Sequence, residues 1–327
     1  MNRRTILSSG AGFALAKAGA PAPSYPILDS HVHLYDPARP QGVPWPNPSQ
    51  TSIYRTFLPA DYRKIATPFG VVGMIEMECS PWVEDNYWVL DAAARDTIVV
   101  GTVGNLYPGK PDFREHLSRL HKNPLFRGIR FGYLWGRKVA EEAPKADFVS
   151  DLKALAEAGL TLDSVGGPAL LQDLVQITDK VPELRVVIDH LPNTQPPEEQ
   201  AARAAYEAAL RELGKRPQVY VKVSEIFQRV DENGRRVRSG GRIPRELSFY
   251  RPRLDAIWEV FGADRVLFAS DWTNSEPMGT FEETLNLVRE YFTSKGPGVP
   301  EKFFWKNSVA AYRWVKRQPD QPQPGAG

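Results

Sequence analysis

Residues 27–33 read ILDSHVH, a short apolar run that ends in two histidines one residue apart. Alternate side chains of a β-strand point to the same face, so a strand here directs His31 and His33 toward one point. A pair of surface histidines gives the same pattern. The function of the pair therefore depends on what the rest of the chain places beside it.

Seven further runs of apolar and β-branched residues follow along the chain. The eight runs span residues 27–33, 71–79, 97–106, 126–133, 160–165, 185–191, 219–226 and 265–272. Helical patterns lie between most of them, for example at residues 151–160, 169–180, 198–214 and 281–292. Parallel strands need helical crossovers, so this alternation predicts an α/β fold, a single-domain (β/α)8 TIM barrel. A doubly wound open sheet is the main alternative, weakened because no GxGxxG motif follows the first run.

Composition limits the classes of partner. The 327 residues are 42% hydrophobic and 24% charged, as in an ordinary globular protein. A net charge of +2 provides no strong attraction to nucleic acid or to an anionic membrane, so we expect small-molecule partners. No stretch approaches the roughly 18 apolar residues of a membrane span. The single cysteine, Cys79, excludes an intrachain disulfide and a cysteine-based zinc cluster.

The two ends of the chain differ in composition from its middle. Arg3 and Arg4 precede a weakly apolar stretch and small residues, a pattern that predicts a twin-arginine signal peptide over residues 1–22. Cleavage near Ala22 to Tyr25 would give a periplasmic or otherwise exported protein. A basic, disordered start of a cytoplasmic protein is the alternative, because Lys17 interrupts the expected pattern. The barrel is then predicted over 23–317, followed by a Pro- and Gly-rich disordered tail over 318–327.

Polar residues gather at the ends of the apolar runs, where the active site of a barrel lies. They are Asp29, His31 and His33 in the first run, Glu76 and Glu78 in the second, Arg127 and Arg130 in the fourth, Asp189 and His190 in the sixth, Lys222 and Glu225 in the seventh, and Ser270, Asp271 and Trp272 in the eighth. Imidazole and carboxylate groups suit a divalent ion such as zinc, so His31, His33 and Asp271 are the predicted metal ligands.

Six segments together resemble, in the same order, the amidohydrolase-related family that includes sugar lactonases and the pyrone-dicarboxylate and sulfomuconolactone lactonases. The segments are LDSHVH, FRGIRF, VVIDHLP, YVKVSE, LFASDW and NSVAAYRW, and the resemblance extends from Tyr25 to Val315. It implies a (β/α)8 fold and hydrolysis of a lactone by a water activated at the aspartate of strand eight. By position, Asp271 matches that acid and His190 matches the family's histidine on strand six.

The resemblance leaves the metal open. The decarboxylase-like and binuclear branches add a histidine on strand five, but the fifth run here, LTLDSV, contains none. Two histidines and an aspartate suffice for one catalytic zinc or manganese ion. Some lactonases of the family work without metal. We therefore expect either one divalent ion or a metal-free site.

The predicted substrate contacts are two cationic side chains, Arg130 and Lys222, and three other side chains, Glu78, Tyr35 and Trp272. Arg130 and Lys222 can face a substrate carboxylate or the oxyanion formed on a lactone carbonyl. The alternative is that they form salt bridges with Glu76 or Glu78 inside the barrel. Glu78 is otherwise expected to orient a sugar hydroxyl.

The other contacts come from loops at the predicted mouth. Tyr35 and Trp45 are expected to form an apolar or sugar-stacking wall, and Trp272 faces either the cavity or the helices. The arginine-rich loop after the seventh run is either a positively charged lid or a solvated loop or subunit contact. The latter leaves a homo-oligomer possible.

These residues suggest a hydrolytic mechanism. Water held near His31 and His33 would lose a proton to Asp271 and attack the ester carbonyl, while Arg130 or Lys222, with His190, stabilises the oxyanion. A metal-dependent decarboxylase of the same superfamily is the enzymatic alternative. A barrel that binds a sugar or aromatic acid without turnover is the non-enzymatic one.

Overall fold

The computed structural model describes residues 25–323, so the predicted signal peptide lies outside the described residues. Its sheet has eight parallel strands in the order β1 to β8, with helices between them, which confirms the (β/α)8 barrel. The strands are β1 (Ile27–Val32), β2 (Val71–Met77), β3 (Val99–Gly104), β4 (Phe126–Arg130), β5 (Thr161–Ser164), β6 (Arg185–Ile188), β7 (Val219–Val223) and β8 (Val266–Phe268).

Hydrogen bonds at the ends of β1 and β8 close the sheet. The backbone N–H of Asp271 donates to the carbonyl of His31 at 2.9 Å, and that of His33 donates to the carbonyl of Trp272 at 2.8 Å. The Ser30 hydroxyl adds a bond to the carbonyl of Phe268 at 2.6 Å. The closure therefore brings HVH of strand one and SDW of strand eight side by side.

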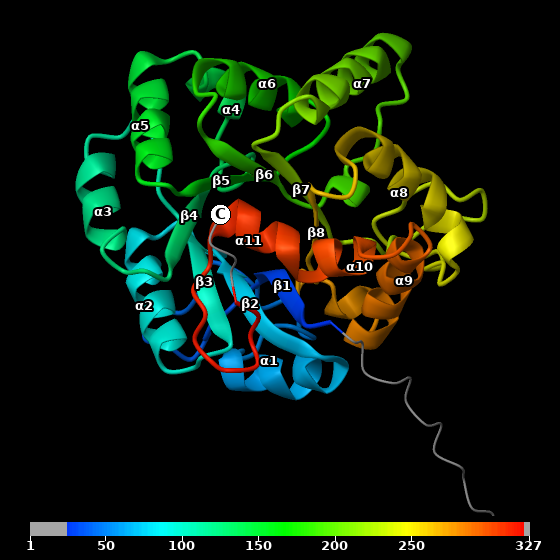
Figure 1. Ribbon diagram of the computed structural model, residues 1–327, viewed down its shortest axis with the longest axis horizontal. Helices are drawn as coiled ribbons and strands as arrows, with labels where there is room; N and C mark the ends of the chain where they lie inside the picture. The colour runs from blue at the N-terminus through cyan, green and yellow to red at the C-terminus, as the bar shows by residue number, and fades with distance from the viewer. Residues whose placement is uncertain (1–24, 324–327) are drawn as a thin grey trace, which may run out of the picture.

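Helices surround the strands as an outer ring (Figure 1). They are α1 (Pro59–Ala66), α2 (Val83–Ala94), α3 (Phe113–Leu120), α4 (Val139–Glu142), α5 (Ala146–Glu157), α6 (Leu170–Lys180), α7 (Gln200–Gly214), α8 (Leu247–Phe261), α9 (Phe281–Thr293), α10 (Val299–Glu301) and α11 (Asn307–Tyr312). A capping box begins α9, where Thr280 and Glu283 satisfy each other's backbone N–H groups. Within residues 25–323, no helix has the length and apolarity that crossing a membrane requires.

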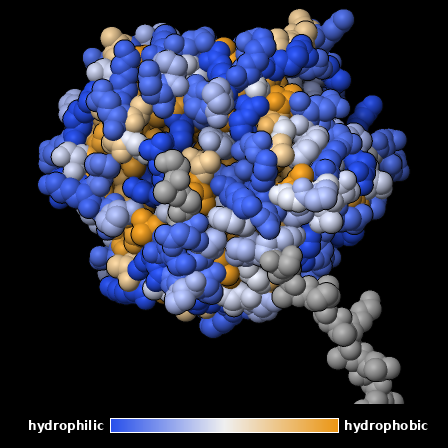
Figure 2. Space-filling view, viewed as in Figure 1, coloured by the Kyte–Doolittle hydropathy of each residue, from blue (hydrophilic) through white to orange (hydrophobic). Residues whose placement is uncertain are grey.

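The interior has two apolar layers. One lies between the strands and the surrounding helices, and the other fills the barrel with side chains such as Leu28, Val103 and Leu267. Tyr312 of α11 and Trp314 belong to the inner layer. Figure 1 shows α11 lying across the end of the barrel. The face in Figure 2, seen from the same direction, is mainly hydrophilic with scattered apolar residues. One end of the barrel is thus closed by apolar packing.

The segment after α11 corrects one prediction. Residues 318–323 were expected to be disordered, but Gln321 is 1% exposed and donates to the carbonyls of Val72 and Thr97 at 3.0 and 2.9 Å. The Arg317 guanidinium donates to four backbone carbonyls between the end of α2 and the start of β3. These hydrogen bonds hold the segment after α11 against the starts of β2 and β3. Residues 324–327 lie outside the described part of the chain.

Candidate active site

A cavity of about 790 Å³ opens at the C-terminal ends of the strands, where the predicted site lies. Loops that follow β1, β2 and β4 to β8 form its walls. Its polar and aromatic lining residues include His33, Trp45, Arg130, Tyr133, Trp135, Asp189, His190, Asn193, Glu225, Arg236, Asp271 and Asn274. The volume is sufficient for a small ring with substituents.

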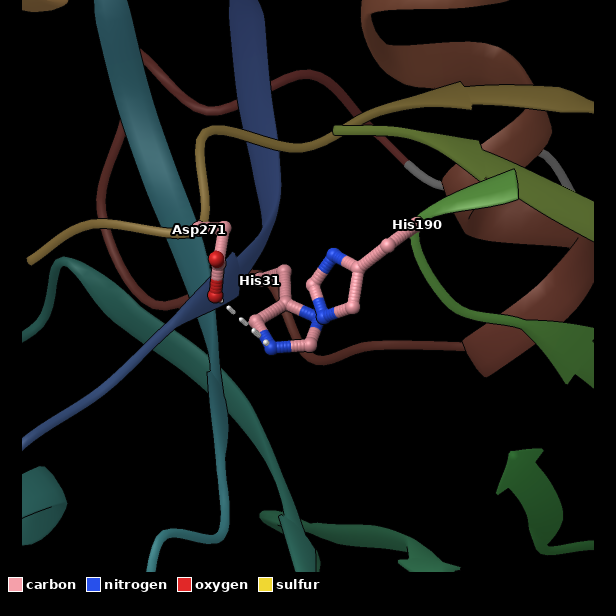
Figure 3. Close-up of side chains that lie close together, drawn as sticks. All are labelled: His31, His190 and Asp271. Atoms are coloured by element: carbon pink, nitrogen blue, oxygen red, sulfur yellow. Dashed lines mark ion pairs between the residues drawn. The ribbon is translucent and has the colours of Figure 1, made fainter. Parts of the chain in front are cut away.

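Three buried side chains converge at the centre of the site (Figure 3). His31 from β1, His190 after β6 and Asp271 after β8 each offer an atom within 4.8 Å of the others. The Nε2 atom of His31 lies 3.4 Å from Oδ1 of Asp271 and has no hydrogen-bond partner among the described residues. These residues come from strands that are far apart in the chain, and barrel closure brings them together.

His33 has a different place from the one predicted. Its ring centroid lies 4.9 Å from that of His31, so the two histidines do share one side of the strand. However, Nδ1 of His33 donates to the carbonyl of Met77 at 2.8 Å, and Nε2 lies 3.1 Å from Oδ1 of Asp271. The group that could hold a metal thus differs from the predicted set in one member, with His190 in place of His33.

The hydrogen bonds of His190 fix its tautomer. Nη2 of Arg130 lies 3.3 Å from its Nε2, and because a guanidinium only donates, this nitrogen accepts. The ring proton is then on Nδ1, which lies 2.7 Å from the Ser224 hydroxyl. Burial lowers the pKa of His190 to about 4, despite the raising effect of Asp271 and Asp189. The single N–H of a neutral His190 is therefore directed at Ser224 and not at an oxyanion in the cavity, which argues against its predicted role in oxyanion stabilisation.

Asp271 is held in its ionised form. Burial alone raises its pKa, but His190, His33 and His31 outweigh burial and hold the pKa well below the usual range. Nδ2 of Asn274 donates to Oδ2 at 2.8 Å and fixes the second oxygen. A charged carboxylate at the cavity wall can accept a proton from water.

The three converging residues fit a divalent ion. Burial and the Lys222 charge hold the pKa of His31 well below its usual value, so the imidazole is neutral, the form that binds metal. The unpartnered Nε2 of His31 is an available ligand atom when the ring proton is on Nδ1, which lies 3.5 Å from Oδ1 of Asp189. Nitrogen and oxygen donors of this kind suit zinc or manganese. An ion here would compete with Arg130 for Nε2 of His190.

Lys222 lies beneath the cavity, which corrects its predicted role as a substrate contact. The side chain is completely buried, and Nζ pairs with Asp163 at 2.7 Å and with Asp189 at 3.0 Å. Nζ also lies 3.3 Å from Nδ1 of His31. Two buried carboxylates need a neighbouring cation, and β7 supplies it beside β5 and β6. The partners are aspartates rather than Glu76 or Glu78.

Arg130 does line the cavity, as predicted, while it is also anchored from behind. Its Nε donates to Oδ2 of Asp189 at 2.8 Å. Glu78 is 5% exposed and accepts from the backbone N–H of Ser80 at 3.0 Å and from the Trp135 indole at 3.3 Å. It lines a smaller neighbouring pocket and is not part of the lining of the main cavity. It therefore holds Trp135 in place from outside the cavity.

The predicted aromatic contacts are only partly at the cavity. Tyr35 is 1% exposed, donates to the carbonyl of Ile53 at 2.9 Å, and supports Trp45 with its ring 5.4 Å away. Trp272 packs against Phe281 of α9 at 5.8 Å and faces the helices. Trp45 lines the cavity itself.

Sequence reasoning missed several residues of the site as functional groups. Asp189 joins Arg130 to Lys222; its position at the end of the sixth apolar run placed it near the site, but no role was predicted for it. Glu225 accepts from Asn274 at 2.8 Å, and burial together with Asp271 raises the pKa of Glu225 to about 8. Nothing in the sequence pattern pointed to Asn274, which lies in a loop.

Comparisons with known proteins give the family and the fold. The family model described as "Amidohydrolase" matches residues 28–314. An L-fucono-1,5-lactonase from Burkholderia ambifaria is 28% identical over 260 residues, 78% of this chain and 82% of that protein. An amidohydrolase from Burkholderia multivorans, solved with bound zinc, has a TM-score of 0.75 at 20% identity and covers 88% of this chain and 99% of its own. A putative 2-pyrone-4,6-dicarboxylic acid hydrolase from Pseudomonas putida has a TM-score of 0.64 at 20% identity, covering 88% of this chain and 97% of its own.

Proposed function

The chain belongs to the amidohydrolase family, and from this membership we propose that it is a lactonase that opens a cyclic ester by attack of water. The names of its relatives support this reaction, since two of them are L-fucono-1,5-lactonases. The observation that carries the proposal is the presence of an ionised carboxylate, Asp271, and a guanidinium, Arg130, on the walls of one cavity.

The proposed reaction uses the two charges in opposite roles. Asp271 takes a proton from water as the water oxygen bonds to the carbonyl carbon. Arg130 stabilises the negative charge that develops on the carbonyl oxygen, and Asp189 and His190 keep the guanidinium oriented. The ring C–O bond then breaks, and the leaving oxygen takes the proton from Asp271. The product is a hydroxy acid, which releases one proton to neutral solution.

We also propose that His31, His190 and Asp271 hold one divalent ion, zinc or manganese. When bound, the ion would supply Lewis-acid polarisation and lower the pKa of water toward ~7. The roles assigned above to Asp271 and Arg130 do not depend on it. Metal analysis of the purified protein tests the assignment, and a His31→Ala variant with unchanged metal content would contradict it.

Aromatic walls suit a ring-shaped substrate. Trp45, Tyr133 and Trp135 line the cavity, and their faces can stack on the C–H surface of a sugar ring or on an aromatic lactone. We therefore propose a sugar lactone or a carboxylated cyclic ester as substrate.

A proton-release screen over sugar and aromatic lactones, run with metal analysis, tests the proposed function. We expect at least one lactone to be hydrolysed well above its spontaneous rate, with the activity lost in Asp271→Asn. Loss of carbon dioxide from aromatic acids without lactone hydrolysis would instead favour the decarboxylase. Ligand binding with no turnover would favour a binding protein.

A further inference from the structure

A second cavity, of about 640 Å³, adjoins the active-site cavity under the loop that follows β7. We call it the side chamber. The two cavities share the wall residues Asn193, Glu225, Arg236 and Asn274. Asn274 also donates to Asp271 at 2.8 Å, so the shared wall reaches the proposed base. A substrate bound at Asp271 is therefore adjacent to the side chamber.

The side chamber has an excess of positive charge. Arg229, Arg236 and Arg238 line it, and none of them forms an ion pair within residues 25–323. Glu225 is the one acidic residue among its described lining residues. Three guanidinium groups therefore exceed the negative charge even when Glu225 is ionised.

Other arginines of the same loop are neutralised. Arg242 pairs with Glu246 at 3.4 Å, and Arg245 pairs with Glu283 at 3.6 Å. Neither of these arginines lines the side chamber. Arg236 donates to the carbonyl of Asn193 at 3.0 Å, whereas the guanidinium groups of Arg229 and Arg238 form no hydrogen bond within residues 25–323. All three therefore face an open volume with no carboxylate paired to them, which points to an anionic ligand.

A buried hydroxyl in the same wall lacks a partner. Ser275 is 8% exposed, and its Oγ has no hydrogen bond to any described residue. Its backbone N–H donates to the carbonyl of Asp271 at 2.9 Å, which fixes its position beside the active site. Leaving a buried hydroxyl without a hydrogen-bond partner is unfavourable. A ligand oxygen in the side chamber would satisfy it.

We propose that the side chamber binds an oxyanionic substituent, a carboxylate or phosphate, carried by the same molecule whose lactone ring lies in the active-site cavity. This inference rests on the proposed lactonase function and narrows its substrate class to anionic lactones. Guanidinium groups bind carboxylate and phosphate through paired hydrogen bonds, and the Ser275 hydroxyl adds a further donor. The arginines of the side chamber would then select substrates by their negative charge, while Asp271 would activate the water that attacks the lactone ring.

Three sugar lactones that differ in charge test the inference. They are D-glucono-1,5-lactone, its 6-phosphate, and D-glucaro-1,4-lactone, which carries a carboxylate. We expect a higher kcat/KM for a charged lactone than for the neutral one, and the two charged lactones distinguish phosphate from carboxylate. The double variant Arg229→Gln/Arg238→Gln should lower the charged-to-neutral ratio of kcat/KM by roughly 10- to 100-fold, as expected for loss of charge-assisted hydrogen bonds.

Arg235→Gln is the matched control, because Arg235 belongs to the same loop but lines neither cavity. It should leave the ratio unchanged. Equal kcat/KM for all three lactones, or an equal effect of the double variant and the control, would overturn the inference. If the wild-type protein hydrolyses none of them and no lactone of the wider screen, the proposed function fails separately. Titration with inorganic phosphate in a calorimeter then tests separately whether the side chamber binds an oxyanion. Phosphate binding by the wild-type protein that the double variant loses supports the inference, and no phosphate binding by the wild-type protein refutes it.

Discussion

Asp271 is the residue on which the proposed chemistry depends, because its environment keeps a buried carboxylate charged. His33 and Asn274 contact its two oxygens, and the imidazoles outweigh the effect of burial on its pKa. Both side chains are fixed by a second hydrogen bond, His33 through Nδ1 to the carbonyl of Met77 and Asn274 through Nδ2 to Glu225. The site is therefore organised before substrate arrives, which is a condition for electrostatic stabilisation of a transition state.

Replacing Asp271 by Asn should abolish most activity without unfolding the protein. The amide is nearly isosteric and keeps an acceptor oxygen, but it cannot take a proton from water. We expect kcat to fall by roughly 10²- to 10⁴-fold. Steady-state kinetics measures the loss, and circular dichroism confirms the fold. An Asp271→Asn variant with near-wild-type kcat would rule out the proposed base, and the exposed Asp61→Asn serves as control.

Asp29 should make stability depend on pH. It is completely buried, and burial raises its pKa to about 6 although Ser270 and Tyr62 donate to it. As pH rises from about 4 to 6, the unfolded chain loses this proton before the folded protein does, so the folded state becomes relatively less stable. The shift corresponds to about 3 kcal/mol.

Asp29→Asn removes this titration while keeping an acceptor for the backbone N–H groups. We expect the difference in free energy of unfolding, variant minus wild type, to become more positive from pH 4 to pH 7. Urea unfolding at the two pH values measures the difference. In Asp61, burial raises the pKa but the Lys64 hydrogen bond outweighs it, so the net pKa is lowered. Asp61→Asn should therefore show the opposite trend, and the same trend in both variants would contradict the assignment.

Neighbouring strands share one ionic layer below the active site. Lys222 of β7 lies between Asp163 of β5 and Asp189 after β6, and Tyr312 of α11 also donates to Asp163. This layer lies between the inner apolar layer, to which Tyr312 belongs, and His31 of the active site. Lys222 therefore neutralises two buried carboxylates of neighbouring strands and does not contact substrate.

Replacing Lys222 by Met should destabilise the protein strongly, because two buried carboxylates lose their cation. Removal of one partner of a buried ion pair costs about 3–5 kcal/mol. Denaturant unfolding measures the loss, and Lys138→Met is the control, since Lys138 forms an exposed pair with Glu141. Unchanged stability with a large rise in KM would restore the predicted substrate contact.

The whole molecule has one closed end and one open end. Trp314 is 2% exposed and packs inside the barrel with Leu28 and Val103, at the end away from the cavity. Trp314→Ala should lower the free energy of unfolding by about 3–5 kcal/mol, because it leaves a void in the inner layer. Trp82→Ala is the control, as Trp82 is 37% exposed. An equal effect of both variants on thermal unfolding would contradict the proposed packing role of Trp314 in the inner apolar layer.

We propose, from the twin arginines at positions 3 and 4, that the protein is exported and loses residues 1–22. Mass spectrometry of protein from the native cell should show a start near Ala22 to Tyr25 in the periplasmic fraction. Intact Met1 or Asn2 in the cytoplasmic fraction would disprove export.

The sequence by itself determined the barrel and the strand ends that carry its chemistry. Eight apolar runs alternating with helical patterns are local signals, and so is the HVH pair, whose common side follows from strand alternation. The disorder predicted from composition was wrong for residues 318–323, because Gln321 donates to buried carbonyls that no local pattern reveals.

Tertiary structure alone decided which polar groups meet. Lys222 and Asp163 are separated by 59 residues, and His33 and Asp271 by 238. Alternation along a strand gives the face of a side chain but not its partner, so the sequence could not choose between His33 and His190 in the central group. It also could not show that Lys222 lies below the cavity or that the side chamber exists. These features depend on distances between strands and loops, which only closure of the barrel sets.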